Sequence, residues 1–183
     1  QRVVDGGDTV LPIRFGTTFG DEDELRSALL EPNAAVLGDM LDQVRGKVEV
    51  QVKATYVEDA VVARAVAGDR RVERLKRSAN LDARVELGRR VAENIERQRY
   101  SDARVVVDVL GQHAQATSLG DPTGEYGLVN VSFLVDREGL AAFDDAFERL
   151  QARVEDLVRF RYVGPLPPYS FVDASALTVA RWA

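Results

Sequence analysis

The sequence contains no cysteine and a single histidine, His113. Without cysteine the chain cannot form a disulfide, a thiolate metal site or a cysteine nucleophile. One histidine excludes a two-histidine metal site, and any serine–histidine–aspartate relay would have to use His113 itself. His113 falls near the expected end of a long helix, where the helix dipole favours a histidine. We interpret it as structural, with haem binding or acid–base chemistry as the alternative.

Long apolar runs are also missing. No stretch approaches the roughly 20 residues that span a bilayer, and the N-terminus shows no charged segment followed by an apolar one, as in a secretory signal. Hydrophobic residues make up 45% of the chain and charged residues 30%, which is typical of a soluble globular protein. Together with the absence of cysteine, this composition agrees with a cytoplasmic location.

Acidic side chains exceed basic ones, which gives a net charge of −6 and a pI near 4.9. That balance argues against a nucleic-acid binder. Residues 64–99 differ, with eleven Lys or Arg against six Asp or Glu, a local net charge of +5. This basic segment could steer an acidic partner, or it could be a solvated helix face with intrahelical ion pairs. The cluster around Arg70 and Arg74 contains no aromatic residue, which disfavours single-stranded nucleic acid.

Motifs for phosphate or metal binding are absent as well. The sequence contains neither GxxxxGK[ST] nor GxGxxG, so it shows no phosphate cradle. The acids at 21–24 lack the spacing of a calcium loop and suit the positive end of a helix instead. We therefore assign no catalytic residue, no cofactor and no metal, and we expect the protein not to be an enzyme.

Hydrophobic periodicity predicts helices and strands in an α+β order. The expected helices cover residues 21–30, 34–44, 57–67, 70–77, about thirty residues from the N-cap Asn80, and 138–154. Gln98 and Asp102 interrupt the apolar stripe of the long helix, which predicts a break or a less buried middle. The expected strands cover residues 9–15, 47–56, 126–135 and 157–163, and residues 117–125 are expected to be a loop. The last three strands should share one sheet, with the helices on one face.

Three of the six prolines lie between Val163 and Val172, at Pro165, Pro167 and Pro168. Because proline fixes φ and lacks an N–H donor, this segment cannot be helical or form a central strand. It is expected to be stiff and extended. It could wrap across the sheet with Tyr169 and Phe171 as packed anchors, or it could present a rigid surface to a partner.

Four segments in order resemble the gas vesicle protein F/L family: VLPIRFG at 10–16, GKVEVQVK at 46–53, NVSFLVD at 130–136 and GPLPPYSF at 164–171. Leu166 stands where the family usually has tryptophan, and Gln51 where an apolar or small residue is common. The resemblance implies two α+β domains, the N-terminal one a modified ferredoxin-like fold. Residues 1–20 would be the end of that domain, 21–45 a helical connection, 46–172 an α+β C-terminal domain with an antiparallel sheet and a long helix, and 173–183 a tail. Because only nine residues precede the first segment, we expect part of the N-terminal domain to be missing here.

The resemblance also implies a function. It predicts a non-catalytic accessory or minor structural protein of gas vesicle assembly, cytoplasmic and associated with the vesicle. Its partners would be the small hydrophobic main shell protein and other accessory proteins, with no nucleic acid and no lipid membrane. Candidate partner-binding or interdomain residues are Arg14, Phe15, Pro167, Pro168, Tyr169 and Phe171. The alternative is a small ligand-binding or enzymatic module on a ferredoxin-like scaffold, which a deep pocket with convergent polar groups would indicate.

Overall fold

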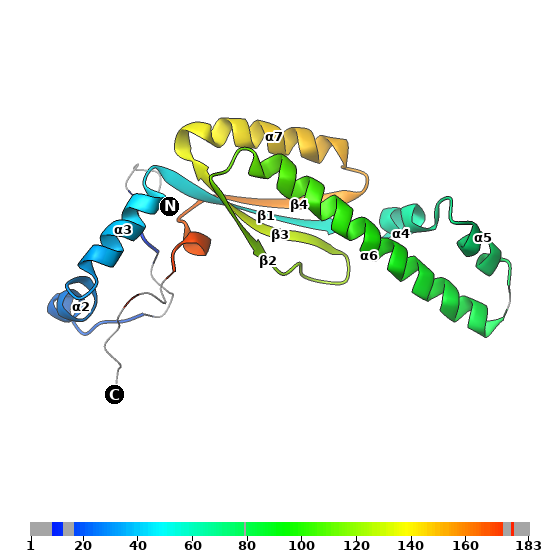
Figure 1. Ribbon diagram of the computed structural model, residues 1–183, viewed down its shortest axis with the longest axis horizontal. Helices are drawn as coiled ribbons and strands as arrows, with labels where there is room; N and C mark the ends of the chain where they lie inside the picture. The colour runs from blue at the N-terminus through cyan, green and yellow to red at the C-terminus, as the bar shows by residue number, and fades with distance from the viewer. Residues whose placement is uncertain (1–8, 13–16, 79, 174–176, 178–183) are drawn as a thin grey trace.

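A four-stranded antiparallel sheet forms the centre of the computed structural model, which describes residues 9–12, 17–78, 80–173 and 177. The strands are β1 (Lys47–Tyr56), β2 (Ala116–Gly120), β3 (Gly127–Asp136) and β4 (Val158–Leu166), and they lie in the order β2-β3-β1-β4. Every neighbouring pair is antiparallel. Two long helices cover one face of the sheet (Figure 1), which confirms the predicted α+β class.

The helical elements follow the predicted segments closely. They are α2 (Glu22–Leu25), the π-helical η1 (Arg26–Leu30), α3 (Ala34–Val44), α4 (Glu58–Val66), α5 (Arg70–Lys76), α6 (Leu81–Gly111), η2 (Arg137–Gly139), α7 (Leu140–Arg153) and η3 (Tyr169–Phe171). Gly46, with φ of 68°, separates α3 from β1, and Gly68, with φ of 74°, separates α4 from α5. Positive φ is accessible to glycine at no steric cost, which explains both breaks.

Residues 47–166 run in the order strand, helices, strand, strand, helix, strand. With the sheet order above, this is the ferredoxin-like βαββαβ arrangement. The resemblance implies that arrangement for the N-terminal domain, whereas the structure shows it within the segment expected to be the C-terminal domain. Residues 1–20 are described only at 9–12 and 17–20. The fold of the N-terminal domain and the domain boundaries therefore stay predictions.

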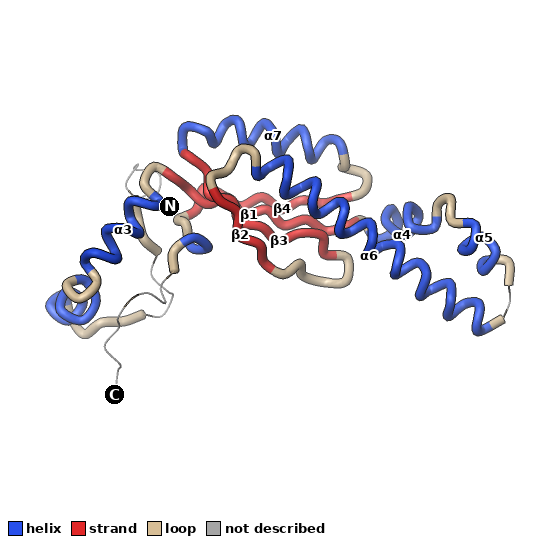
Figure 2. The backbone as a smooth tube through the Cα atoms, in the orientation of Figure 1, coloured by secondary structure: helices blue, strands red, loops and turns tan. Residues whose placement is uncertain are grey.

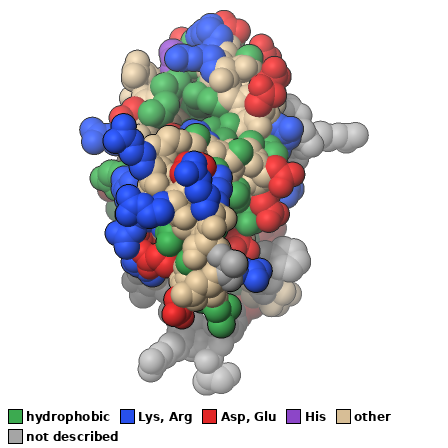
Figure 3. All heavy atoms as spheres, turned by 90° about the vertical axis from the view of Figure 1, so that its right-hand side faces the viewer, with side chains coloured by type: hydrophobic (Ala, Val, Ile, Leu, Met, Phe, Trp, Pro, Cys, Tyr) green, Lys and Arg blue, Asp and Glu red, His purple; other side chains and the backbone are tan. Residues whose placement is uncertain are grey.

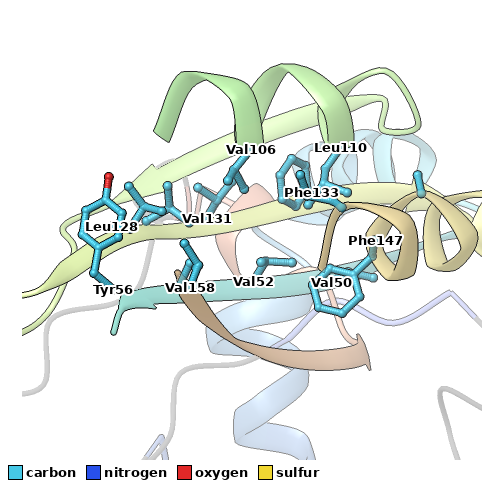
Figure 4. Packing of buried hydrophobic residues seen from close by; sticks show 14 of the residues in the cluster. Val50, Val52, Tyr56, Val106, Leu110, Leu128, Val131, Phe133, Phe147 and Val158 are labelled. Carbon is cyan, nitrogen blue, oxygen red and sulfur yellow. The ribbon is translucent and has the colours of Figure 1, made fainter. Parts of the chain in front are cut away.

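The hydrophobic core lies between the sheet and the helices α6 and α7. Alternate side chains of β1 and β3 point to this side, and Val50 pairs with Phe133 across the two strands. Phe133 and Phe143 of α7 are both fully buried, with ring centroids 5.3 Å apart. Figure 4 shows Val106 and Leu110 of α6 descending onto the same layer. The apolar stripe of α6 is therefore buried where it crosses the sheet.

The polar middle of α6 does not break the helix. Instead it faces Tyr56 at the end of β1 and Arg64 of α4. The Tyr56 hydroxyl donates to Asp102 Oδ2 at 2.6 Å, and Arg64 Nε donates to Gln98 Oε1 at 3.0 Å. The guanidinium of Arg64 also pairs with Asp102. Burial, with the hydrogen bond to Asp102 next in size, raises the pKa of Tyr56 well above its usual range.

Two parts of the sequence prediction were wrong. Residues 117–125 were expected to be a loop, but 116–120 form the edge strand β2, in which Leu119 opposite Val131 is 70% exposed. An exposed edge strand needs no alternation of apolar residues, so the pattern gave no signal. Conversely, residues 9–12 of the expected strand 9–15 have no regular structure, and residues 13–15 lie outside the described residues.

Helices α4 and α5 and the first half of α6 project beyond the sheet (Figure 2), and we call them the arm. Asp69 holds the arm together. Its carboxylate accepts hydrogen bonds from Asn94 Nδ2 at 3.1 Å and Arg90 Nε at 3.0 Å, and from the amides of Arg71 and Val72 at the start of α5. These contacts, that of Asn94 first, hold the pKa of Asp69 far below its usual range.

This lowered pKa predicts that the arm loosens in acid. A carboxyl with a depressed folded-state pKa contributes stability above its unfolded pKa of about 3.9 and loses it as the pH falls towards the folded value. We expect the melting temperature of the wild type to exceed that of Asp69→Asn at about pH 6, and the gap to narrow between about pH 4 and pH 2. Thermal unfolding followed by circular dichroism measures the gap. A gap that stays constant over this pH range would contradict the assignment.

Candidate functional site

The proline strap, residues 163–172, begins inside β4 and ends in η3. The structure continues the strand through Pro165 to Leu166, three residues further than predicted. Proline is tolerated there because β4 is an edge strand whose register against β1 shifts at this point. A Cβ added at Gly164 would lie 3.2 Å from Val50 Cγ2, so a larger residue there would require β1 to shift by a few tenths of an ångström.

Glu49 fastens the strap to the sheet. It lies between Val48 and Val50 on β1 and therefore points away from the helices, to the second face of the sheet. Its side chain is buried, at 3% exposure. It accepts hydrogen bonds from Ser132 Oγ of β3 at 2.8 Å, from Ser170 Oγ at 2.8 Å and from the Ser170 amide at 2.7 Å. A buried carboxylate is tolerated when it accepts several such bonds.

Around Ser170 the strap places its predicted site residues in different environments. Pro168 is buried, whereas Pro167 and Phe171 are half-buried. Tyr169 is 58% exposed and does not pack as an anchor. Ser170 is itself exposed, but its amide and hydroxyl reach Glu49, while the neighbouring ring of Tyr169 faces solvent.

Sequence reasoning missed Glu49, Ser132 and Ser170. Glu49 looked like any polar residue on the outer side of a half-buried strand, next to Lys47 and Gln51. The available signal was that Glu49 lies in the motif at 46–53 and Ser132 in the motif at 130–136, both of which resemble the family. Which polar residue of a strand is buried depends on the segment that packs over that face of the sheet, here the strap. The sequence pattern of the strand does not show where that segment lies.

The first and last motifs of the sequence meet beside α3. A small hollow of about 10 Å³ is lined by Val10, by Val44 of α3, by Lys47 and Arg137, and by Leu166, Pro167 and Pro168 of the strap. Leu166, which stands in place of the usual tryptophan, therefore faces the first motif. Arg14 and Phe15 lie outside the described residues, so their interdomain or partner-binding role stays a prediction.

The chemical possibilities of the described residues are limited. No group of three or more His, Cys, Asp or Glu among them is placed to hold a metal ion. His113 follows α6, half-buried, with its amide donating to Leu110 O at 3.0 Å. A larger hollow, of about 460 Å³, is open to solvent and lies on the arm between Gly68, Arg70, Glu73, Arg74 and Arg77. Within the described part of the chain, no helix is long and apolar enough to cross a membrane.

The family model for the gas vesicle synthesis protein GvpL/GvpF matches residues 1–173. The chain belongs to this family. Gas vesicle protein F of Streptomyces sp. (strain CB03234) is 35% identical over 173 residues, which cover 91% of this chain and 71% of the relative. Gas vesicle protein F1 of Halobacterium salinarum is 28% identical over 165 residues, covering 90% of this chain and 60% of the relative.

Solved structures of the GvpL/GvpF family share the fold. The crystal structure of GvpF from Anabaena sp. PCC7120 aligns with a TM-score of 0.80 and 23% identity, covering 93% of this chain and 72% of that one. GvpF from Microcystis aeruginosa aligns with a TM-score of 0.74 and 22% identity, covering 93% and 73%. The strap and the buried Glu49 therefore belong to a gas vesicle-associated protein.

Proposed function

We propose that this protein is a non-catalytic accessory or minor structural component of gas vesicle assembly. In this role it binds the small hydrophobic main shell protein and supports vesicle nucleation or formation in the cytoplasm. The observation that carries the proposal is the proline strap, a rigid segment that is fixed from below by Glu49 and exposes Tyr169 at its surface.

The chemistry of the expected partner explains why such a surface is needed. An apolar shell subunit aggregates through exposed hydrophobic surface and free strand edges unless a partner covers them before it joins a lattice. A stiff proline segment loses little conformational entropy on binding, and an exposed tyrosine offers apolar area together with a polar tip. The strap supplies both within a few residues.

Binding of the shell protein by the full-length protein tests the proposal. We expect Tyr169→Ala to weaken capture of the shell protein at least tenfold, which corresponds to about 1.4 kcal/mol or more. The matched control is Tyr100→Ala, because Tyr100 is 75% exposed on α6 and lies outside the strap. It should bind like the wild type.

Two results would contradict the proposal at different levels. If Tyr169→Ala and Tyr100→Ala bind equally well, the strap is not the binding surface. If the full-length wild type fails to bind the shell protein and deletion of its gene leaves vesicles normal, the assembly role itself is wrong.

The competing proposal is a ligand-binding or enzymatic module on the ferredoxin-like scaffold. It requires an enclosed pocket with convergent polar groups. The hollow beside the strap has a volume of only about 10 Å³, and the hollow on the arm is open and lined mainly by arginine. Both observations favour a protein surface over a small-molecule site.

A further inference from the structure

The tip of the arm carries three arginines that no carboxylate of the described residues pairs with. Arg70 and Arg74 of α5, and Arg77 directly after it, recur at intervals of four and three and line the open hollow of about 460 Å³. None of the three is in an ion pair with any described residue, whereas Arg71, Lys76, Arg89 and Arg90 nearby all pair with Asp or Glu. Figure 3, which faces this end of the molecule, shows Lys and Arg side chains gathered on it.

The opposite end of the described structure is acidic. Residues 21–45, which form α2, η1 and α3, contain seven Asp or Glu and two Arg, a net charge of −5. Figure 1 places α2 and α5 at the two ends of the longest axis. Glu22, Asp23 and Glu31 are exposed at the acidic end. The described structure therefore carries opposite net charges at its two ends, since residues 64–99 carry +5.

Both ends also expose apolar side chains. Leu81 and Val85, one turn apart at the start of α6, are 71% and 67% exposed. Leu30, at the end of η1, is 43% exposed. Adjacent exposed apolar residues such as Leu81 and Val85 can add affinity by burial where charge sets the orientation of a contact.

We propose that the acidic end of one copy of this chain binds the arginine-lined hollow of a second copy. The contact is head-to-tail, so each bound copy leaves one free end of each kind, and repetition builds an open chain of molecules. A second copy fits better than a nucleic acid. The hollow has no aromatic lining and contains Glu73, and the chain as a whole carries a charge of −6.

Sedimentation velocity over a range of protein concentrations tests the proposal. We expect association at low salt that weakens at least tenfold between about 50 and 500 mM salt, because salt screens exposed charges. Arg70→Glu/Arg74→Glu/Arg77→Glu and, separately, Glu22→Lys/Asp23→Lys/Glu31→Lys should each be monomeric. The control Arg149→Glu/Arg153→Glu/Arg161→Glu makes the same charge change at exposed arginines outside both ends and should associate like the wild type.

A one-to-one mixture of two neutralised variants, Arg70→Gln/Arg74→Gln/Arg77→Gln and Glu22→Gln/Asp23→Asn/Glu31→Gln, separates this contact from a general charge effect, because neither variant gains a new charged surface. The hollow variant keeps its acidic end and the other variant keeps its hollow, so one contact can form between them. We expect a dimer that does not grow further. Circular dichroism confirms that each variant is folded.

Three results would overturn the proposal. These are a wild type that stays monomeric at low salt, a mixture that forms no dimer, and association that survives either set of charge reversals. A wild type that is monomeric but binds an acidic peptide or a DNA duplex through the three arginines would reassign the hollow to that ligand.

Discussion

Replacing Glu49 by alanine is expected to free the proline strap and to lower the free energy of unfolding by about 2–4 kcal/mol. The carboxylate accepts three hydrogen bonds, two from Ser170 and one from Ser132. Hydrogen bonds to a charged group contribute about 1.5–3 kcal/mol each in favourable cases, and donors that lose a buried acceptor pay a desolvation cost. Relief of the cost of burying a charge offsets part of this loss.

Glu49→Gln separates the hydrogen bonds from the charge. The amide keeps one acceptor oxygen but adds a donor group where the neighbours are themselves donors, so we expect an intermediate loss of stability. Glu148→Ala, an exposed position on α7, is the control and should change stability by less than about 0.5 kcal/mol. Urea unfolding measures all three variants.

Hydrogen exchange decides whether the loss is local to the strap. In Glu49→Ala the Ser170 amide should exchange much faster. The exchange rates of amides at the centre of β1 and β3 should rise only by the amount that the loss of global stability predicts. If the Ser170 amide keeps its wild-type protection, Glu49 does not fasten the strap. Free strap residues would also weaken shell-protein binding through Tyr169, which links this prediction to the proposed function.

The elements that sequence analysis predicted well are those whose burial follows a period. β1 alternates Val48, Val50 and Val52 with polar residues, and α3 begins and ends at the predicted residues because its apolar stripe stops at Gly46. The strap itself was located by its prolines, whose effect on the backbone is independent of the surroundings. In these places local chemistry and tertiary structure agree.

The missed features depend on contacts between distant segments. β2 is a strand because β3 pairs with it, and its own residues carry no alternation. Glu49 is buried because Ser170, 121 residues later, crosses above it. Gln98 and Asp102 interrupt an apolar stripe because they bind Arg64 of α4. In each case the interaction joins two segments that are far apart in the sequence. The pattern of one segment alone therefore does not predict it.

Removing the carboxylate of Asp102 is expected to loosen the contact between α4 and the middle of α6. Asp102→Ala leaves the buried Tyr56 hydroxyl without its acceptor and Arg64 without its ion pair. We expect a loss of about 1–3 kcal/mol in the free energy of unfolding, most of it from Tyr56, because Arg64 is partly solvated and its ion pair is screened. Asp108→Ala on the same helix is the matched control. Its exposed pair with Arg104 should be worth less than about 1 kcal/mol.

The pH dependence of the same network provides an independent test. The pKa of Tyr56 is raised in the folded state, so its contribution to stability is complete below the unfolded value of about 10 and is lost as the pH rises towards the folded value. Burial also raises the pKa of Tyr162, so the signal of Tyr56 is the difference in tyrosinate absorbance between wild type and Asp102→Ala. In Asp102→Ala, burial still raises the pKa of Tyr56 but the hydrogen bond and the negative charge no longer do, so ionisation should begin at lower pH. An unchanged titration would show that Tyr56 and Asp102 are not coupled in solution.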